Sequence, residues 1–520
     1  MLSMKADIII IGGSIGGCMA AYSAARLGKK VILTEETDWI GGQFTSQAVP
    51  PDEHLWVEKF GCTDTYRDFR QRVRRYYRDY YPLREKERNN PFLNPGNAWV
   101  SRLAFEPKVA LKIFYDFLHP YLSNGQVTLL LNYYPISVST HQDQINNIVI
   151  ENNNEQRITL TGHYYLDATE CGDLLPLANV DYRLGAESKQ MTGEPSALER
   201  YIKEDVQSLT QVFALEYKKG ENHMIDKPDM YDDWKNYQAP FLAHKQLSWK
   251  IPDAQTGHSK MMRMFNKGQT LGLWEYRRII DKQLFAEGFY QGDISLINWP
   301  QNDYWLGSII DVTKEEKLKH LHMSKQLSMS LLYWLQTEAP RPDGGKGYPG
   351  LRLRPDVVGT ADGIAKHPYI RESRRIVSYH TVKEQHINAS FNHEGVKQYE
   401  DSVGIGAYRI DLHPTVVTNR LFYAPSYPFE IPLGSFIPIR MKNLLPSCKN
   451  IGCTHITNGC MRVHPVEWNI GESAGALAVF AINVGKHPVD IYQNKQLVKE
   501  YQSILQKLGV NIHWPQLGVL

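Results

Sequence analysis

The chain has 520 residues, of which 42% are hydrophobic and 22% charged, and its formal net charge is +2 at pH 7. This composition is typical of a globular protein with two or three domains, and the small net charge gives no overall attraction to nucleic acid or to an anionic membrane. No apolar stretch approaches the roughly 18–20 residues that span a bilayer, no secretory signal is visible, and the cysteines are too scattered for a disulfide framework. We therefore expect a cytoplasmic protein.

The first 35 residues predict a strand, a glycine-rich turn, a helix and a second strand. Residues 6–11 (ADIIII) are apolar and rich in β-branched side chains, as in a central parallel strand buried on both faces. Residues 12–17 (GGSIGG) form the turn, residues 18–27 the helix, and residues 30–35 (KVILTE) the second strand. This order within about 30 residues is the context in which a glycine fingerprint indicates dinucleotide binding.

The residue types in this unit suit a pyrophosphate and a ribose. Gly12 allows the tight turn, Gly17 allows close packing of helix on strand, and the helix N-terminus attracts the pyrophosphate. Glu35 ends the second strand, where an acid accepts hydrogen bonds from ribose hydroxyls. Ser14 replaces the middle glycine, and a glycine-rich turn in an unrelated α/β fold remains the alternative. The predicted nucleotide-binding residues are Gly12, Gly13, Ser14, Ile15, Gly16, Gly17, Glu35 and Glu36.

The segment after the fingerprint favours FAD over NAD as the nucleotide. Residues 38–45 (DWIGGQFT) are similar to the acid, spacer and Gly-Gly segment of glutathione-reductase-like flavoproteins. Gly41 and Gly42 permit close approach of the backbone to the cofactor. Gln43 and Thr45 are predicted to offer polar groups near the reactive ring, although a loop that merely turns would have a similar sequence.

Three later segments occur in the order that a flavin-binding fold needs. Residues 127–131 (VTLLL) and 164–169 (YYLDAT) predict further strands. The second ends in Asp167, Ala168 and Thr169, and it resembles the Asp-Ala-Thr-Gly strand end of the same superfamily, with Glu170 in place of the glycine.

The C-terminal part predicts a short strand over 443–447 and then a helix that opens at Asn469. The amides at its N-terminus, with Gly471 and Glu472, are expected to face the pyrimidine edge of the flavin, where negative charge develops on reduction. Arg462, just before this helix, is expected to support the flavin or its pyrophosphate.

With these segments the chain resembles the FAD-dependent oxidoreductases, relatives of the fumarate reductase, thiazole-synthesis and tRNA-uridine-modification flavoproteins. The resemblance implies FAD binding and no particular substrate. The fold class expected is α/β, with a Rossmann-like FAD-binding domain (a parallel sheet with a β-meander) and a mixed α+β substrate domain. The segments that carry the resemblance are residues 37–51, 94–102, 167–175, 368–375, 402–414 and 449–476.

We expect a discontinuous FAD-binding domain over residues 1–50, 100–185 and 430–490. Residues 50–100 are predicted as a helical insertion or cap, 186–430 as the substrate domain, and 491–520 as a helical tail. Residues 67–88 are rich in arginine and tyrosine, but apolar and aromatic residues recur at helical spacing and form one face, with the arginines on the other: Phe69, Val73, Tyr76, Tyr77 and Tyr80. A solvated amphipathic helix is therefore favoured there over an RNA-binding segment.

Arginines cluster at residues 368–375 (PYIRESRR). Arg371 and Arg374 are predicted to bind a carboxylate or phosphate of the substrate, because guanidinium groups form paired hydrogen bonds with such anions. The alternatives are an ion-pair network between domains or contacts to the FAD phosphates.

Two histidines are candidates for proton transfer. Arg409, Asp411 and His413 alternate, so on a strand they share one face, and an acid beside an imidazole forms a usable base. His464 and Glu467 precede the predicted flavin-facing helix, and His464 is the favoured proton-transfer residue. Structural hydrogen bonding at His413 and helix capping at His464 are the alternatives.

No second glycine fingerprint follows a strand, so we expect no domain for a nicotinamide cofactor. The mechanism expected is that of an oxidase, dehydrogenase or desaturase, in which a small polar organic substrate, with a carboxylate as one option, donates hydride to the flavin. Dioxygen or another acceptor would reoxidise it. RNA modification and a non-catalytic flavin-binding role are the alternatives. No group of His, Cys and acidic residues has the spacing of metal ligands, so no metal site is expected. Cys448 and Cys453 could form a redox pair. The sequence leaves the oligomeric state open.

Overall fold

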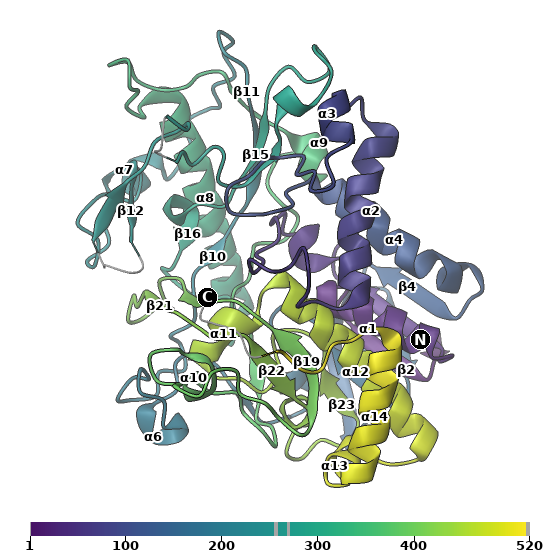
Figure 1. Cartoon of the computed structure of the whole chain (residues 1–520). Coiled ribbons are helices and arrows are strands. Elements are labelled where there is room, and N and C mark those ends of the chain that lie inside the picture. The colour runs from purple at the N-terminus through teal and green to yellow at the C-terminus, as the bar shows by residue number, and fades with distance from the viewer. Residues whose placement is uncertain (1, 254–257, 268–270, 516–520) are drawn as a thin grey trace.

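The computed structural model describes residues 2–253, 258–267 and 271–515 (Figure 1). Its nucleotide-binding half contains a five-stranded sheet with the order β23-β8-β2-β3-β4, in which every pairing is parallel. The strands expected in these segments are thus confirmed; β4 has the predicted bounds and the other four are slightly shorter. They are β2 (Ile8–Ile11), β3 (Val31–Glu35), β4 (Val127–Leu131), β8 (Tyr164–Asp167) and β23 (Leu444–Pro446).

Both faces of this sheet are covered, which explains why β2 is apolar throughout. Helices α1 (Ile15–Arg26), α4 (Pro107–Ser123) and α12 (His464–Val484) pack on one face. On the other face, Ile9 and Ile11 of β2 join a core with the strands of a second sheet, β1-β7-β6-β5.

The second sheet contains the predicted β-meander. Strands β5 (Tyr133–His141), β6 (Gln144–Asn152) and β7 (Arg157–Thr161) are antiparallel neighbours. Strand β1 (Leu2–Lys5), which we did not predict, adds to β7 in parallel.

Helices α1 and α12 touch through their backbones. A Cβ on Gly471 would lie 2.2 Å from the carbonyl oxygen of Gly16, and a Cβ on Gly475 would lie 2.3 Å from that of Ala20. The predicted start of this helix at Asn469 is wrong, because α12 begins at His464 and has Pro465 in its first turn. Proline is preorganised for that position, where a missing amide costs no hydrogen bond.

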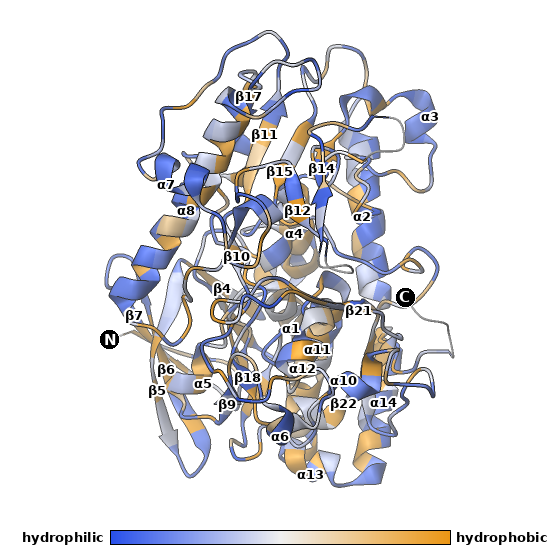
Figure 2. Ribbon diagram, turned by 90° about the vertical axis from the view of Figure 1, so that its left-hand side faces the viewer, coloured by the Kyte–Doolittle hydropathy of each residue, from blue (hydrophilic) through white to orange (hydrophobic). Residues whose placement is uncertain are grey.

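The other half is built on an antiparallel sheet with the order β14-β15-β11-β17 and the long helix α8 (Lys314–Thr337). Figures 1 and 2 show β11 and β15 of this sheet toward the opposite end of the molecule from α13 (Pro488–Tyr492). A separate core fills this half and includes Phe213, Trp274, Trp299 and Leu331. The mixed α and β content expected of this part is confirmed. Its strands are β11 (Phe213–Tyr217), β14 (Arg278–Ile280), β15 (Ile294–Ile297) and β17 (Leu351–Leu353).

Helix α2 (Asp64–Tyr80) forms the main part of the predicted helical insertion. Phe69, Val73 and Tyr77 are buried as expected and Tyr76 is partly buried, but the prediction is wrong for Tyr80, which is 71% exposed at the end of the helix. The expectation that the arginines of this helix are solvated is wrong for Arg70 and Arg74, because both are buried and form ion pairs with Glu58. These two side chains are therefore not available to an RNA backbone.

No helix in the described part of the chain is long and apolar enough to cross a membrane. The remaining elements are η1 (Gly42–Phe44), α3 (Glu85–Arg88), α5 (Leu174–Leu177), β9 (Tyr182–Arg183), α6 (Lys189–Thr192), β10 (Leu209–Thr210), α7 (Tyr231–Asn236), β12 (Lys250–Pro252), β13 (Ser259–Met261), η2 (Lys282–Leu284), η3 (Pro300–Asn302), β16 (Asp303–Tyr304), α9 (Pro355–Val358), β18 (Arg375–Ile376), α10 (Glu384–Ile387), β19 (Ser402–Gly406), β20 (Ile410–Leu412), β21 (Phe422–Ala424), β22 (Phe429–Pro432), η4 (Leu433–Phe436), α11 (His455–Met461), α13 (Pro488–Tyr492) and α14 (Lys495–Leu508).

Candidate active site

The glycine fingerprint forms a loop between β2 and α1 with the expected geometry. Gly12 has φ +101°, and a Cβ there would lie 2.3 Å from the carbonyl oxygen of Ala168. A Cβ on Gly17 would lie 2.0 Å from the carbonyl oxygen of Gly12, so this glycine permits the close helix–strand contact. Ser14 is the N-cap of α1, and its Oγ accepts a hydrogen bond from the Gly17 amide at 3.2 Å. The N-terminus of α1 therefore opens at this loop, where its dipole favours a phosphate.

The carboxylate predicted to bind ribose stands beside the loop. Glu35, at the end of β3, accepts hydrogen bonds from the amides of Gly13 and Thr37, each at 2.9 Å. Burial, together with the charge of the neighbouring Glu36, raises the pKa of Glu35 to about 7. Glu36 itself pairs with His367 at 3.1 Å.

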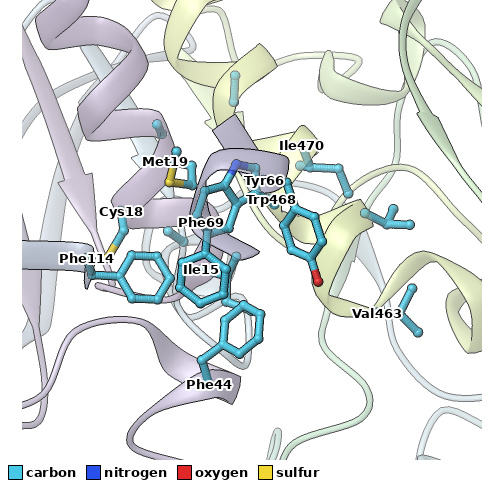
Figure 3. Packing of buried hydrophobic residues seen from close by; sticks show 14 of the residues in the cluster. Ile15, Cys18, Met19, Phe44, Tyr66, Phe69, Phe114, Val463, Trp468 and Ile470 are labelled. Carbon is cyan, nitrogen blue, oxygen red and sulfur yellow. The ribbon is translucent and has the colours of Figure 1, made fainter. Parts of the chain in front are cut away.

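The Gly41–Gly42 segment is fastened directly to the fingerprint loop. Both glycines have positive φ, +104° and +50°, and the Gly41 amide donates to the carbonyl of Gly13 at 2.7 Å. Phe44 then enters an aromatic cluster with Phe69 of α2, and Phe69 contacts Trp468 of α12 with a ring separation of 5.1 Å (Figure 3). This cluster holds the cofactor loop in place.

Two predicted contact residues of this region use their side chains locally. The hydroxyl of Thr45 donates to the carbonyl of Ile40 at 2.7 Å. Asp167 accepts hydrogen bonds from Thr169 and from the Leu174 amide, so its carboxylate closes the turn after β8. Any contact between the turn after β8 and the cofactor is therefore made by groups other than the Asp167 carboxylate.

Gly471 and Glu472 do not lie at a helix N-terminus, contrary to expectation. Because α12 begins at His464, both residues are in its interior. Gly471 packs on Gly16, and the Glu472 carboxylate accepts a hydrogen bond from Thr65 of α2. Both residues therefore contribute to the packing of α12 against α1 and α2.

Arg462 connects the cofactor loop with the substrate side. Its backbone carbonyl accepts a hydrogen bond from the Gln43 side chain at 3.0 Å. Its guanidinium donates to Tyr369 at 2.7 Å and to the carbonyl of Asp411 at 3.0 Å. The loop that begins at Gly41 and the strand that carries Asp411 are thus joined through one buried residue.

His464 has both ring nitrogens engaged by the backbone. Its Nδ1 accepts a hydrogen bond from the Asp52 amide at 3.2 Å, and its Nε2 lies 3.1 Å from the Val49 carbonyl, to which it donates. The side chain is fully buried, and burial lowers its pKa to about 4. This geometry favours a neutral, structural histidine over the proton-transfer residue that we predicted.

Glu467 belongs to a buried charge cluster that we did not foresee. Lys449 has no exposed surface; it pairs with Glu170 and, at 3.2 Å, with Glu467. Burial raises the pKa of Glu467 to about 7. One oxygen of each carboxylate and the Oε1 of Gln43 have no hydrogen-bond partner among the described residues. Polar atoms beside the cofactor loop therefore remain to be satisfied by a bound group.

The arginines at 371–375 form ion pairs within the protein, which is one of the alternatives stated above. Arg371 is buried and contacts Asp303 at 2.9 Å, the Ser208 carbonyl at 3.0 Å and Thr210 at 2.8 Å. Arg374 pairs with Asp311, and Arg375 with Glu187 and Glu372. The prediction that Arg371 and Arg374 bind a substrate anion is therefore not supported by their geometry. Cys448 and Cys453 are separate buried thiols.

His413 lies at a cavity of about 540 Å³ and has a carboxylate partner. Its Nδ1 lies 2.6 Å from Oδ2 of Asp303, and its Nε2 lies 3.9 Å from Oδ2 of Asp411. Burial opposes ionisation of Asp303, but Arg371 and His413 outweigh it and hold the pKa of Asp303 at about 2. Arg409, Asp411 and His413 all line this cavity, so the prediction that they share one face is confirmed.

Asp303, Glu53 and Lys449 were missed in the sequence. Asp303 stands 110 positions from His413, and no local motif marks it. Glu53, in the Pro-Pro-Asp-Glu segment after the cofactor loop, lines the cavity. Only its position after the Gly-Gly segment could have drawn attention to it.

The parallel sheet, the glycine loop and the acid at the end of β3 define a dinucleotide-binding α/β protein. The family described as FAD dependent oxidoreductase matches residues 7–505, and the chain belongs to this family. The protein is therefore an enzyme with FAD as its cofactor. The glycine loop, the Glu35 carboxylate and the unsatisfied polar atoms at Gln43 and Glu170 fit this group.

Solved structures that are similar to this chain have low sequence identity to it. Quinol fumarate reductase FrdA of E. coli is 10% identical over 98% of this chain and 74% of its own, with a TM-score of 0.33. A geranylgeranyl bacteriochlorophyll reductase-like protein of Thermoplasma acidophilum is 11% identical over 97% and 84%, with a TM-score of 0.32. The myxobacterial chondrochloren halogenase CndH is 15% identical over 42% of this chain and 45% of its own, with a TM-score of 0.23, so this chain spans under half of that protein. No curated protein matches the chain, and none of these likenesses indicates a substrate.

Proposed function

We propose that the enzyme oxidises an alcohol group of a small polar molecule, with His413 as the base and FAD as the hydride acceptor. The observation that supports this most is the link through Arg462. This residue contacts Gln43 of the cofactor loop and the backbone of Asp411 in the cavity wall. The cavity beside His413 is thereby attached to the cofactor loop through a single residue, whose backbone carbonyl bonds to Gln43 and whose guanidinium bonds to the Asp411 carbonyl.

The Asp303–His413 pair suits a base in this cavity. The ionised Asp303 accepts a hydrogen bond from Nδ1–H of His413, which leaves the lone pair of Nε2 free for a substrate hydroxyl. Arg371 keeps Asp303 ionised and fixes its orientation from the other side. His413 is partly exposed, with 25% of its side chain accessible, whereas Asp303 is buried.

The reaction balances as a two-electron oxidation. Nε2 of His413 takes the proton of the substrate hydroxyl. Hydride leaves the carbon atom that bears this hydroxyl, and a C=O bond forms. FAD, when bound, supplies the two-electron acceptor for the hydride. Dioxygen or another acceptor then removes the electrons, and His413 returns its proton to water.

Anaerobic stopped-flow spectroscopy tests this proposal. The purified flavoprotein is mixed with alcohols, hydroxy acids, amines and saccharides, and bleaching of the flavin absorbance identifies a reducing substrate. His413→Gln should slow flavin reduction by that substrate about 10²–10⁴-fold, the usual contribution of a positioned base. His223→Gln is the matched control, because His223 pairs with Glu221 at 2.6 Å outside the cavity and should leave the rate unchanged.

Two results would contradict the proposal. One is reduction of the His413→Gln flavin at the wild-type rate. The other is bleaching of the flavin by amines alone, since an amine has no alcohol hydroxyl from which His413 could take a proton.

A further inference from the structure

A second hollow of about 410 Å³ adjoins the His413 cavity. The two share the lining residues Glu53, Trp99, Val100, Tyr408 and Arg409. The cavity volume of about 540 Å³ lies within the range of roughly 300–1,000 Å³ that is usual for small-molecule sites. Together they form a cleft longer than one compact substrate needs.

Aromatic side chains stand in the walls of this cleft. Trp99 is 39% exposed, and its ring centroid lies 4.7 Å from that of Tyr276. The indole N–H already donates to the Gly272 carbonyl at 2.9 Å, so the part of Trp99 that is left for a ligand is its aromatic face. Such a face attracts C–H groups that carry partial positive charge, as on the flat side of a sugar ring. Phe241, Trp305, Tyr408 and Tyr423 line the same cavity.

The cleft also offers hydrogen-bond acceptors on different walls. The Glu53 side chain is 1% exposed; its Oε1 pairs with Arg70 and accepts from the Tyr66 hydroxyl at 2.7 Å. Its Oε2 has no partner among the described residues. Asp411 faces the cavity near His413. Because a buried acceptor without a donor is costly, a ligand with several hydroxyl groups would be stabilised here.

The charges lining the cavity argue against an amine as the ligand. Arg70 neutralises Glu53, and Arg371 neutralises Asp303. The lining also includes the carboxylates Asp253 and Asp411, but the cations Lys250, Lys260 and Arg409 line the same cavity and offset their negative charge. Acceptors without excess negative charge suit hydroxyl donors.

We infer that the cleft binds a polyhydroxylated substrate, a mono- or disaccharide, that stacks on Trp99 and donates hydroxyl hydrogen bonds to Glu53 and Asp411. This inference rests on the proposed function in that it names the substrate class of the same cavity. One sugar hydroxyl then lies at His413, while the adjoining hollow receives a neighbouring part of the molecule.

Binding is measured apart from catalysis, on the oxidised flavoprotein, by saturation-transfer NMR and calorimetry. The probes are D-glucose, D-glucuronate, D-galactose, cellobiose and maltose, with benzylamine and L-lactate as comparators. We expect at least one saccharide to bind. Trp99→Ala should weaken its binding about three- to tenfold, as for the loss of one aromatic contact. Phe92→Ala is the matched control, because Phe92 is 60% exposed and lines neither hollow.

Glu53→Gln provides an independent variant, since glutamine keeps an acceptor for Tyr66 and replaces the free acceptor by a donor. It should weaken binding of the same saccharide. Absence of saccharide binding, or wild-type affinity in Trp99→Ala, would overturn the inference. Saccharide binding without flavin bleaching would support the substrate class and contradict the oxidation. Bleaching of the flavin by lactate without saccharide binding would support the oxidation and contradict the saccharide as the substrate class.

Discussion

Replacing His464 by glutamine should make the protein less sensitive to acid. Glutamine is uncharged and can copy both hydrogen bonds of the neutral imidazole, since its oxygen can accept from the Asp52 amide and its nitrogen can donate to the Val49 carbonyl. A protonated His464 would instead turn an N–H towards the Asp52 amide inside the protein. The substitution thus removes the titration and keeps the local contacts.

The size and sign of the effect follow from the pKa of His464. Burial lowers this pKa from 6.5 to about 4 in the folded protein. As the pH falls below 6.5, the unfolded chain binds a proton at this position before the folded protein does, so stability is lost between pH 6.5 and 4. At ~1.36 kcal/mol for each pKa unit, the loss is roughly 3 kcal/mol over that window. In His464→Gln this contribution is absent.

Urea unfolding of the two proteins, followed by tryptophan fluorescence at pH 7 and pH 4.5, measures the difference. Other acid-sensitive groups, such as the buried His54 with its pKa of about 4, are common to both proteins and cancel. Wild type should lose about 2 kcal/mol more than the variant between these pH values. Equal losses would refute the neutral, backbone-bound state of His464 and restore it as a titrating residue.

Two further predictions concern buried charges. Arg371→Met should lower the free energy of unfolding by about 3–5 kcal/mol, because it removes the guanidinium beside the buried Asp303 carboxylate and leaves only His413 and Thr210 as its partners, whereas Arg409→Met at the cavity wall should change it by less than ~0.5 kcal/mol. Urea titration distinguishes these outcomes, and an Arg371→Met protein of wild-type stability with a raised KM would return Arg371 to substrate binding. Glu35→Ala should raise the Kd for FAD about 10- to 100-fold, the value of a hydrogen bond to a charged group, in fluorescence titrations of the apoprotein. An unchanged Kd would remove Glu35 from the nucleotide site.

The nucleotide-binding half could be predicted because its signals are local. The isoleucines of β2, the glycines after them and Glu35 lie within one short βαβ unit, and each residue type is required by its immediate neighbours. The start of α12 was misplaced at Asn469, where Gly471 and Gly475 suggested a helix N-terminus that approaches the flavin. Their actual role is contact with α1, which lies more than 400 positions away in the sequence, although Pro465 did mark the first turn.

The roles of the arginines and histidines could not be predicted in the same way. Arg371 is occupied by Asp303 and by the backbone of Ser208, and His413 obtains its orientation from the same Asp303. A sequence pattern shows which groups are present, but the partner that decides between binding and ion pairing lies on another element. Arg409, Asp411 and His413 were correctly expected to face the same way because alternation along β20 and its two flanking residues is again a local property.

The close contact between α1 and α12 also has a consequence for the order of folding during synthesis. At roughly 5–20 residues per second, a ribosome needs about 20–90 s to proceed from α1 to the end of α12. During this time the glycine- and alanine-rich side of α1 has no helix to pack against, and β8 lacks its neighbour β23. The antiparallel half, encoded between these segments, can form its own core first. We therefore expect nascent chains to acquire flavin only after α12 has emerged, and to depend on chaperones until then.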